Sequence, residues 1–151
     1  YTATDTITSV TFTGFDSDDY YSLRLLGFVK TTTNDCWGNI YINGDENDSN
    51  YYRELLRDYG GTHEISNQNN PGISWIVDNG GNATIDIDNI NVDLSGNPRW
   101  MARVMGDSSS GLRVDQSFGM GTTVISSITS IKLKTNGWAA GSNFILMGLK
   151  K

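Results

Sequence analysis

Hydrophobic and polar residues alternate with a period of two along most of this chain, and this spacing constrains the fold more than any other feature. Val10 and Phe12 alternate with hydroxyl residues, and Ile131 and Leu133 alternate with two lysines. Because successive side chains of a strand point to opposite faces of its sheet, this pattern predicts half-buried antiparallel strands. The same pattern recurs at 23–28, 39–43 and 100–104.

Turn-forming residues separate these runs. Eight or more short strands with such spacing predict an all-β fold, either an antiparallel β-sandwich or a β-barrel. The 151 residues suit a single domain spanning 1–151, which is long enough to bury a core without disulfides. Glycine, Asn-Gly and Asn-Pro turn signals stand at Gly14, 43–44, 60–61, 70–72, 79–81, 95–98, 106–111 and 136–137.

Two stretches allow more than one local structure, and a third predicts a turn. The alternation in 83–94 changes phase at Asn89, which predicts either a β-bulge or a bend between two strands. Residues 52–59, YRELLRDY, predict a strand or a single helical turn. The stretch 42–53, INGDENDSNYYR, predicts a hairpin-like turn followed by the start of the next strand.

Charge and cysteine content exclude several classes of partner and site. A net charge of −6 and a pI near 4.5 argue against nucleic acid or an anionic membrane as the main partner. The single Cys36 excludes an intramolecular disulfide, and with His63 as the only histidine a Cys/His zinc site is excluded as well. No apolar run is long enough for a transmembrane helix. The chain begins at Tyr1 without a basic leader, so we expect either a processed protein or a piece of a longer one.

Two segments carry a resemblance to a known family. That family ends in a strand reading I-x-S-I-x-L, a variable turn, and then x-A-G-S-x-I-x-L-Y-G-I-K. The corresponding end of this chain is SITSIKLKTNGWAAGSNFILMGLKK, residues 127–151. The family also often carries an N-G-D segment followed by N-Y and Arg, similar to 43–45, 50–51 and Arg53 here. On these motifs the chain resembles a jelly-roll domain found in many bacteriophage virion proteins.

The resemblance implies a jelly-roll β-sandwich that serves as a non-enzymatic structural module in a phage tail tip, fibre or capsid decoration. It also implies location on the virion, contact with other virion proteins and self-association, frequently as a homotrimer, with no cofactor. Met147 stands where the family usually has tyrosine, so a role for that tyrosine does not carry over.

The last predicted strand, 144–149, is hydrophobic on both faces. Phe144, Leu146 and Gly148 project one way, and we expect this set to face the core. Two environments suit the other set: a contact between subunits, or a second covered face within one domain. The candidate oligomer contacts are Ile145, Met147 and Leu149.

Metal and catalytic sites find little support in the residue pattern. Asp45 begins an oxygen-rich stretch, but the EF-hand glycine and glutamate positions hold Asn50 and Leu56, so turns are the preferred interpretation. Asp86 and Asp88 have the spacing of a glycosidase pair, yet they also have the ordinary pattern of an exposed strand face. A Ser/His/Asp arrangement would have to use His63, which is expected in a polar loop where nothing predicts a fixed geometry. We therefore predict no metal, no cofactor, no catalytic residues and no enzyme.

Aromatic and amide side chains gather around the stretch 37–53. Sugars are bound by ring stacking together with amide, carboxylate and guanidinium hydrogen bonds, so this stretch predicts a glycan-binding surface. It could serve host-surface recognition by a virion protein, or a carbohydrate-binding module of a secreted or enzyme-associated protein. The alternative is that some of these rings lie in the core or between subunits. The candidate glycan-binding residues are Trp37, Tyr41, Asn43, Asp45, Tyr51, Tyr52 and Arg53.

Overall fold

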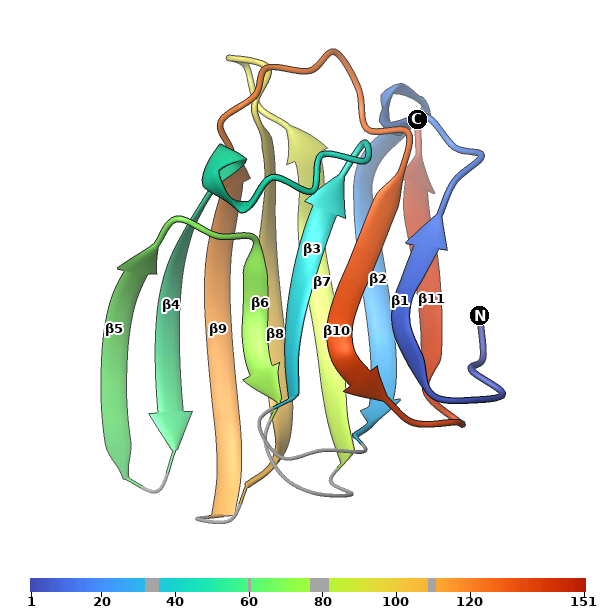
Figure 1. Cartoon of the computed structure of the whole chain (residues 1–151). Helices are drawn as coiled ribbons and strands as arrows, with labels where there is room; N and C mark the ends of the chain where they lie inside the picture. The colour runs from blue at the N-terminus through green and yellow to red at the C-terminus, as the bar shows by residue number, and fades with distance from the viewer. Residues whose placement is uncertain (32–35, 60, 77–81, 109–110) are drawn as a thin grey trace.

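The computed structural model of this chain, which describes residues 1–31, 36–59, 61–76, 82–108 and 111–151, is a sandwich of two antiparallel β-sheets (Figure 1). The smaller sheet has the order β1-β10-β3-β6 and the larger one β11-β2-β7-β8-β9-β4-β5. The strands are β1 (Ile7–Phe12), β2 (Tyr20–Lys30), β3 (Cys36–Ile42), β4 (Tyr51–Tyr59), β5 (Thr62–Gln68), β6 (Gly72–Ile76), β7 (Asn82–Val92), β8 (Pro98–Ser108), β9 (Gly111–Gly121), β10 (Ile131–Trp138) and β11 (Asn143–Lys150). Two 3₁₀ turns, η1 (Ser17–Asp19) and η2 (Asp48–Asn50), precede β2 and β4.

The strand order is that of a jelly roll with two additions. Strands β1-β10-β3-β6 face β2-β7-β4-β5, as in the two four-stranded sheets of that fold. The hairpin β8–β9 is inserted between β7 and β4, and β11 is added beside β2. The predicted antiparallel sandwich is therefore confirmed, and the alternative of a closed barrel is wrong.

Hydrophobic residues that alternate in the sequence meet between the two sheets. Burial of their apolar surface is the main stabilising contribution to such a fold. The largest side chains that are fully buried include Trp138, Phe144, Leu25, Ile40, Ile73, Ile85, Ile87, Ile90, Ile128, Ile131 and Leu133.

The locally ambiguous stretches now have definite structures. Asn89 has a φ of 50° and the β7–β8 register shifts between Asp88 and Asn91, so the phase change is a β-bulge. The stretch 52–59 is part of strand β4, not a helical turn. In 42–53 the predicted turn forms at Asn43-Gly44 and the next strand starts at Tyr51. The connection is not a hairpin, because β3 and β4 belong to different sheets and it crosses between them. The loop predicted around His63 is also wrong, since His63 lies in edge strand β5.

Strand β11 has one covered and one uncovered face. Phe144 is fully buried and Leu146 packs against the core, whereas Ile145, Met147 and Leu149 are 57%, 41% and 65% exposed. The interpretation that both faces are covered within one domain is therefore wrong. None of the short helical turns in the described residues has the length or hydrophobicity needed to cross a membrane.

The two sheets differ in width, and this difference creates an overhang. Strand β6 is the edge of the smaller sheet and packs over β8 and β9, while the larger sheet continues past it through β4 and β5 (Figure 1). Ser117 Oγ of β9 donates to the Ile73 carbonyl of β6 at 3.0 Å, which ties the two sheets together at this edge. On the inner face of β4, Arg53 and Arg57 lie on either side of the buried Leu55, and Gln68 and Glu64 of β5 lie opposite the two arginines.

Candidate ligand-binding cleft

A cleft of about 350 Å³ opens at the edge of the smaller sheet, between β3, the turn η2 and the overhanging β4. Its volume lies in the range of sites that enclose small organic ligands. Two aromatic residues come from β3, and most of the remaining lining is polar. The lining residues are Trp37, Gly38, Asn39, Tyr41, Asp48, Arg53, Gln68, Asn70, Gly72 and Lys134.

Tyr41 anchors the wall of the cleft formed by β3. Its hydroxyl donates to Asp48 Oδ1 at 2.8 Å and accepts from Asn39 Nδ2 at 3.1 Å. Burial and the hydrogen bond with Asp48 raise the pKa of Tyr41 to about 12, so the hydroxyl stays protonated at neutral pH. The ammonium of Lys134 lies 5.8 Å from the centre of the Tyr41 ring. These contacts fix the orientation of two polar groups that a ligand can reach, Asn39 and Asp48.

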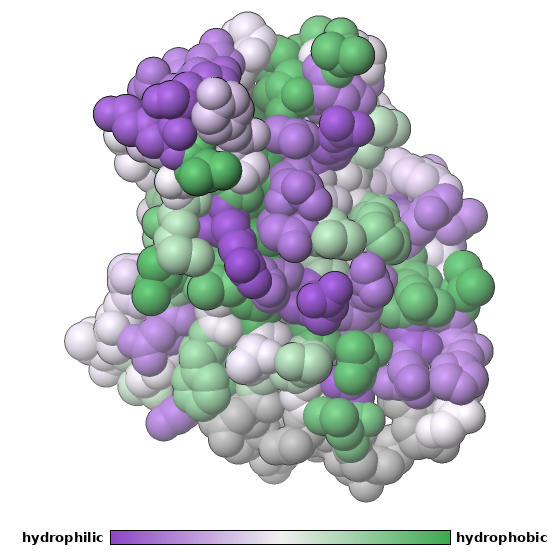
Figure 2. All heavy atoms as spheres, turned by 180° about the vertical axis from the view of Figure 1, so that it is seen from behind, coloured by the Kyte–Doolittle hydropathy of each residue, from purple (hydrophilic) through white to green (hydrophobic). Residues whose placement is uncertain are grey.

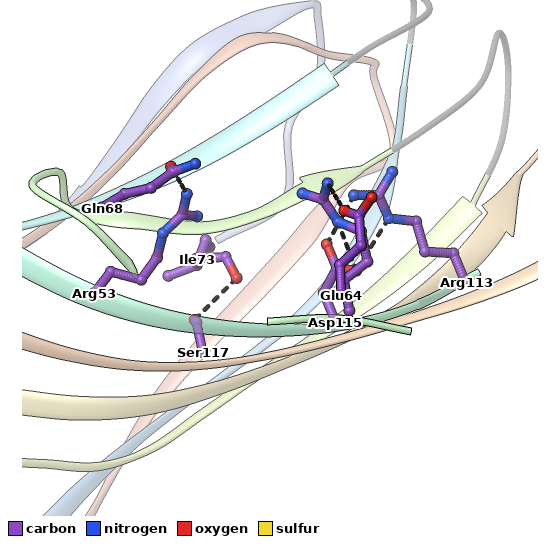
Figure 3. Close-up of polar contacts among 8 residues, drawn as sticks. Arg53, Glu64, Gln68, Ile73, Arg113, Asp115 and Ser117 are labelled. Carbon is purple, nitrogen blue, oxygen red and sulfur yellow. Dashed lines mark hydrogen bonds and ion pairs between the residues drawn. The ribbon is translucent and has the colours of Figure 1, made fainter. Parts of the chain in front are cut away.

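Arg53 lies at the opposite wall and is 2% exposed. Its Nη2 donates to Gln68 Oε1 (Figure 3). The same oxygen accepts from Asn70 Nδ2 at 2.9 Å. Asn70 in turn accepts from the backbone N–H of Gly72 at 3.0 Å. A Cβ at Gly72 would collide with the Arg53 guanidinium, so glycine leaves the space that this group occupies. The segment 68–72 therefore holds Arg53 in place by amide contacts rather than by an ion pair.

A second charged group lies further along the inner face of β4 and β9, beyond Arg53. Asp115 is fully buried and accepts from Arg113 Nε and Nη2 at 3.1 and 3.0 Å. Arg57 Nε lies 3.5 Å from Asp115 Oδ1, and Arg57 Nη1 lies 3.4 Å from the exposed Glu64. Figure 3 shows this group, separated from Arg53 and Gln68 by the Ser117–Ile73 hydrogen bond. The charges of Arg57 and Arg113 are thus matched by Asp115 and Glu64.

The structure divides the predicted glycan-binding residues among three places. Trp37, Tyr41 and Arg53 line the cleft together. Asn43, Asp45 and Tyr51 do not reach it and instead line a separate cavity of about 160 Å³ at one end of the sandwich. Tyr52 points to the opposite face of β4 from Arg53, because the two are adjacent in a strand.

Asn43 and Asp45 hold the crossing connection in shape. Asn43 has a φ of 51°, accepts from the backbone N–H groups of Thr129 and Ser130 at 2.8 and 3.1 Å, and donates to the Ser127 carbonyl at 2.7 Å. Asp45 accepts from the Asn47 backbone at 3.1 Å and from the Asn50 amide at 2.9 Å. The two segments of the family resemblance therefore contact each other in space, and Asn43 and Asp45 have structural roles.

Tyr51 belongs to the core, as the alternative interpretation of the aromatic residues allowed. It is 2% exposed, and its ring centre lies 5.9 Å from those of Tyr41 and Trp100. Its hydroxyl donates to the Asp45 carbonyl at 2.7 Å and accepts from the Ile42 N–H at 3.0 Å. Burial raises the pKa of Tyr51 to about 12.

Several cleft residues were not predicted, because chain segments that are distant in the sequence supply them. Gln68 ends β5, Asn70 lies in the β5–β6 connection and Gly72 begins β6. Lys134 comes from β10, whose register places it opposite Asn39. The turn signal at 70–72 identified that connection, although nothing local indicated which surface it would join. Asp48 is the exception, because its position seven residues after Tyr41 in the oxygen-rich stretch could have suggested it.

The residues considered for metal binding and catalysis have local partners. Asp86 forms an ion pair with Arg24 of the neighbouring strand, at 2.6 Å, on the outer face of the larger sheet. Exposed His63 lies 3.6 Å from Asp58. In the part of the chain that the structure describes, no three His, Cys, Asp or Glu side chains are grouped so that they could hold a metal ion.

Comparison with known proteins identifies no relative from which a function could be inferred. Neither a scan against protein-family models nor searches of curated proteins and solved structures find a match to this chain. A functional assignment therefore depends on the geometry of the cleft and of the exposed sheet face.

Proposed function

We propose that this chain is a non-enzymatic recognition module that binds a glycan in the cleft between β3 and β4. The observation that carries the proposal is the composition of the lining: the rings of Trp37 and Tyr41 on one wall, with amide, carboxylate and guanidinium groups around them. Sugar rings present apolar C–H faces together with hydroxyl groups that need both donors and acceptors. Asn39, Gln68 and Asn70 can supply both, and Asp48 supplies an acceptor.

The biological setting that we propose is the surface of a phage virion. The support for it is the resemblance of the segments 43–53 and 127–151 to phage jelly-roll domains, together with their mutual contact through Asn43. A cleft in such a module would contact a host-surface glycan. The alternative setting is a carbohydrate-binding module of a secreted or enzyme-associated protein, which would use the same cleft. Labelling virions with an antibody against this domain distinguishes the two settings.

Replacing Trp37 by alanine tests the glycan cleft. We expect the affinity for a glycan identified on an array to fall by about tenfold or more, because the variant loses the stacking surface. Isothermal titration calorimetry measures the change, and Tyr21→Ala is the matched control, since Tyr21 is a 67% exposed aromatic residue of β2 outside the cleft. Absence of binding to any glycan, or equal affinities for the two variants, would contradict the proposal.

Self-association is a second candidate function, and the uncovered outer face of the larger sheet favours it. Large apolar side chains gather there on both sides of a hydrophilic band (Figure 2). One group surrounds a hollow of about 400 Å³ lined partly by Leu26, Phe28, Met105 and Ile145. Extensive exposed apolar surface of this kind is typical of contacts between protein subunits. A homotrimer is the assembly that the family resemblance implies, and the exposed apolar residues Ile145, Met147 and Leu149 of β11 are the candidate contacts.

Ile145→Asp tests this assembly. We expect the wild-type protein to be oligomeric at micromolar concentration and the variant to shift to monomer, because the contact would bury an unpaired charge. Size-exclusion chromatography with light scattering measures the mass. Leu94→Asp is the matched control, since Leu94 is a fully exposed loop residue whose replacement adds the same charge. A wild-type protein that is strictly monomeric would contradict the candidate.

A further inference from the structure

Arg53 is a buried cation without an anionic partner. Among the described residues, every ion pair that includes an arginine involves Arg24, Arg57 or Arg113, and none includes Arg53. Its Nε is buried and has no hydrogen-bond partner, while its Nη2 is bound only to the neutral amide of Gln68. Burial and the nearby charge of Arg57 lower the pKa of Arg53 to about 10, and the charge of Asp115 offsets this only in part, so the guanidinium still carries its charge at neutral pH.

Such an arrangement destabilises the free protein, because a buried charge is costly unless a counter-charge accompanies it. The adjacent Arg57–Asp115–Arg113 group shows how this chain neutralises other arginines on the same face. Arg53 lacks this compensation, and its side chain lines the cleft. An unpaired charge that faces a ligand cavity is typical of a group whose partner is the ligand.

The charges around the cleft make an anion its best occupant. The lining contains Arg53, Lys134 and Asp48, a balance of one positive charge in a protein whose net charge is −6. Lys134 is paired with Glu46 at 3.1 Å, and Asp48 is exposed to solvent and accepts the neutral Tyr41 hydroxyl. Arg53 is therefore the buried lining charge that has no ion pair among the described residues.

We infer that the cleft selects an acidic sugar and that Arg53 binds its carboxylate. The inference rests on the proposed glycan-binding function and specifies the class of ligand. The planar guanidinium matches the geometry of a carboxylate, and charge-assisted hydrogen bonds of this kind are stronger than neutral ones. Trp37 and Tyr41 are placed to contact the sugar ring, and the amides of Asn39, Gln68 and Asn70 its hydroxyl groups. A hexuronic acid and a sialic acid share this chemistry.

The experiment compares matched ligands on the wild-type protein. One pair is oligogalacturonides and the same oligosaccharides after reduction of their carboxyl groups; the other pair is sialyllactose and lactose. We expect at least one acidic ligand to bind about tenfold or more tightly than its neutral counterpart in calorimetric titration. The pair that shows the preference identifies the source of the carboxylate. This comparison needs no variant, so it does not depend on whether a substituted protein folds.

Arg53→Gln then tests the residue. We expect the preference for the acidic ligand to disappear while the melting temperature stays equal or rises, because the variant loses a buried charge that has no carboxylate partner. Arg99→Gln is the matched control, since Arg99 is an exposed arginine of β8 bonded to Asn91 and its replacement changes the net charge equally. Arg53→Lys keeps the charge without the planar fork, and we expect an intermediate affinity.

The outcomes separate this inference from the function on which it rests. Equal binding of acidic and neutral members of both pairs overturns the inference and leaves glycan binding in place. No binding of any glycan removes the proposed function and the inference together. An acidic preference that persists in Arg53→Gln overturns the role of Arg53, because another group must then hold the carboxylate.

Discussion

Replacing Asp115 by alanine lowers the free energy of unfolding by about 3–5 kcal/mol, because it removes a buried counter-charge that two partly buried arginines share. Asp115 is fully buried, accepts both hydrogen bonds from Arg113 and lies 3.5 Å from Arg57 Nε. A loss of this size is a large share of the roughly 5–15 kcal/mol that stabilises a typical domain. Urea denaturation followed by circular dichroism measures it, with linear extrapolation to zero denaturant.

Two comparisons separate loss of the ion group from loss of a carboxylate in general. Glu64→Ala removes an exposed carboxylate that also pairs with Arg57, and we expect a change below about 1 kcal/mol. A triple variant that replaces Arg57 and Arg113 by methionine and Asp115 by leucine should recover most of the stability, because no unpaired charge remains. If Asp115→Ala lowered the free energy of unfolding no more than Glu64→Ala, the buried carboxylate of Asp115 would not be the main stabilising partner of the two arginines.

The alternating pattern predicted those strands that bury one face. Ile131 and Leu133 point into the core and the lysines beside them point out, which is the arrangement that a period of two encodes. Strand β5 lies in the overhang, where neither face is covered by a second sheet, and its sequence THEISNQ has no such pattern. Without a buried face there is no hydrophobic alternation, so His63 was wrongly predicted to lie in a loop.

Turn chemistry indicated where the chain bends, but not which strands the bend connects. Asn43 and Gly44 have positive φ values, as an Asn-Gly pair predicts. Whether the chain then returns along the same sheet depends on pairing with distant strands. Here β3 pairs with β10 and β6, whereas β4 pairs with β9 and β5. The crossing, and with it the jelly-roll order, is a property of those long-range pairings.

The candidate site was predicted in part, for a related physical reason. Trp37 and Tyr41 were placed together correctly, because residues four apart in a strand share a face. Tyr51 and Arg53 also share a face of β4 and are both 2% exposed, but Tyr51 packs against the rings of Tyr41 and Trp100 whereas Arg53 lines the cleft. The residues beside Arg53 come from the segment 68–72, which nothing near Tyr51 in the sequence indicates. These distant neighbours decide which aromatic residue is core and which polar residue can meet a ligand.

Replacing Phe144 by alanine removes the side chain that joins the closing strand to the core, and we expect it to lower the free energy of unfolding by about 3–5 kcal/mol. Phe144 is fully buried, and its ring centre lies 4.8 Å from that of Trp138. Its ring also covers Gly27, where a Cβ would lie 3.0 Å from Phe144 Cδ1, so alanine leaves a cavity that Gly27 cannot fill. Urea denaturation measures the loss.

Ile145→Ala is the matched control for Phe144→Ala, because Ile145 is the next residue along the strand and is 57% exposed on the opposite face. At low protein concentration we expect it to change the free energy of unfolding by less than about 1 kcal/mol. Repeating both measurements at higher concentration then separates packing within the domain from packing between copies. A cost of Phe144→Ala that is independent of concentration belongs to the core, whereas a cost of Ile145→Ala that grows with concentration belongs to a subunit contact. Equal costs at every concentration would contradict the assignment of the two faces of β11 to different environments.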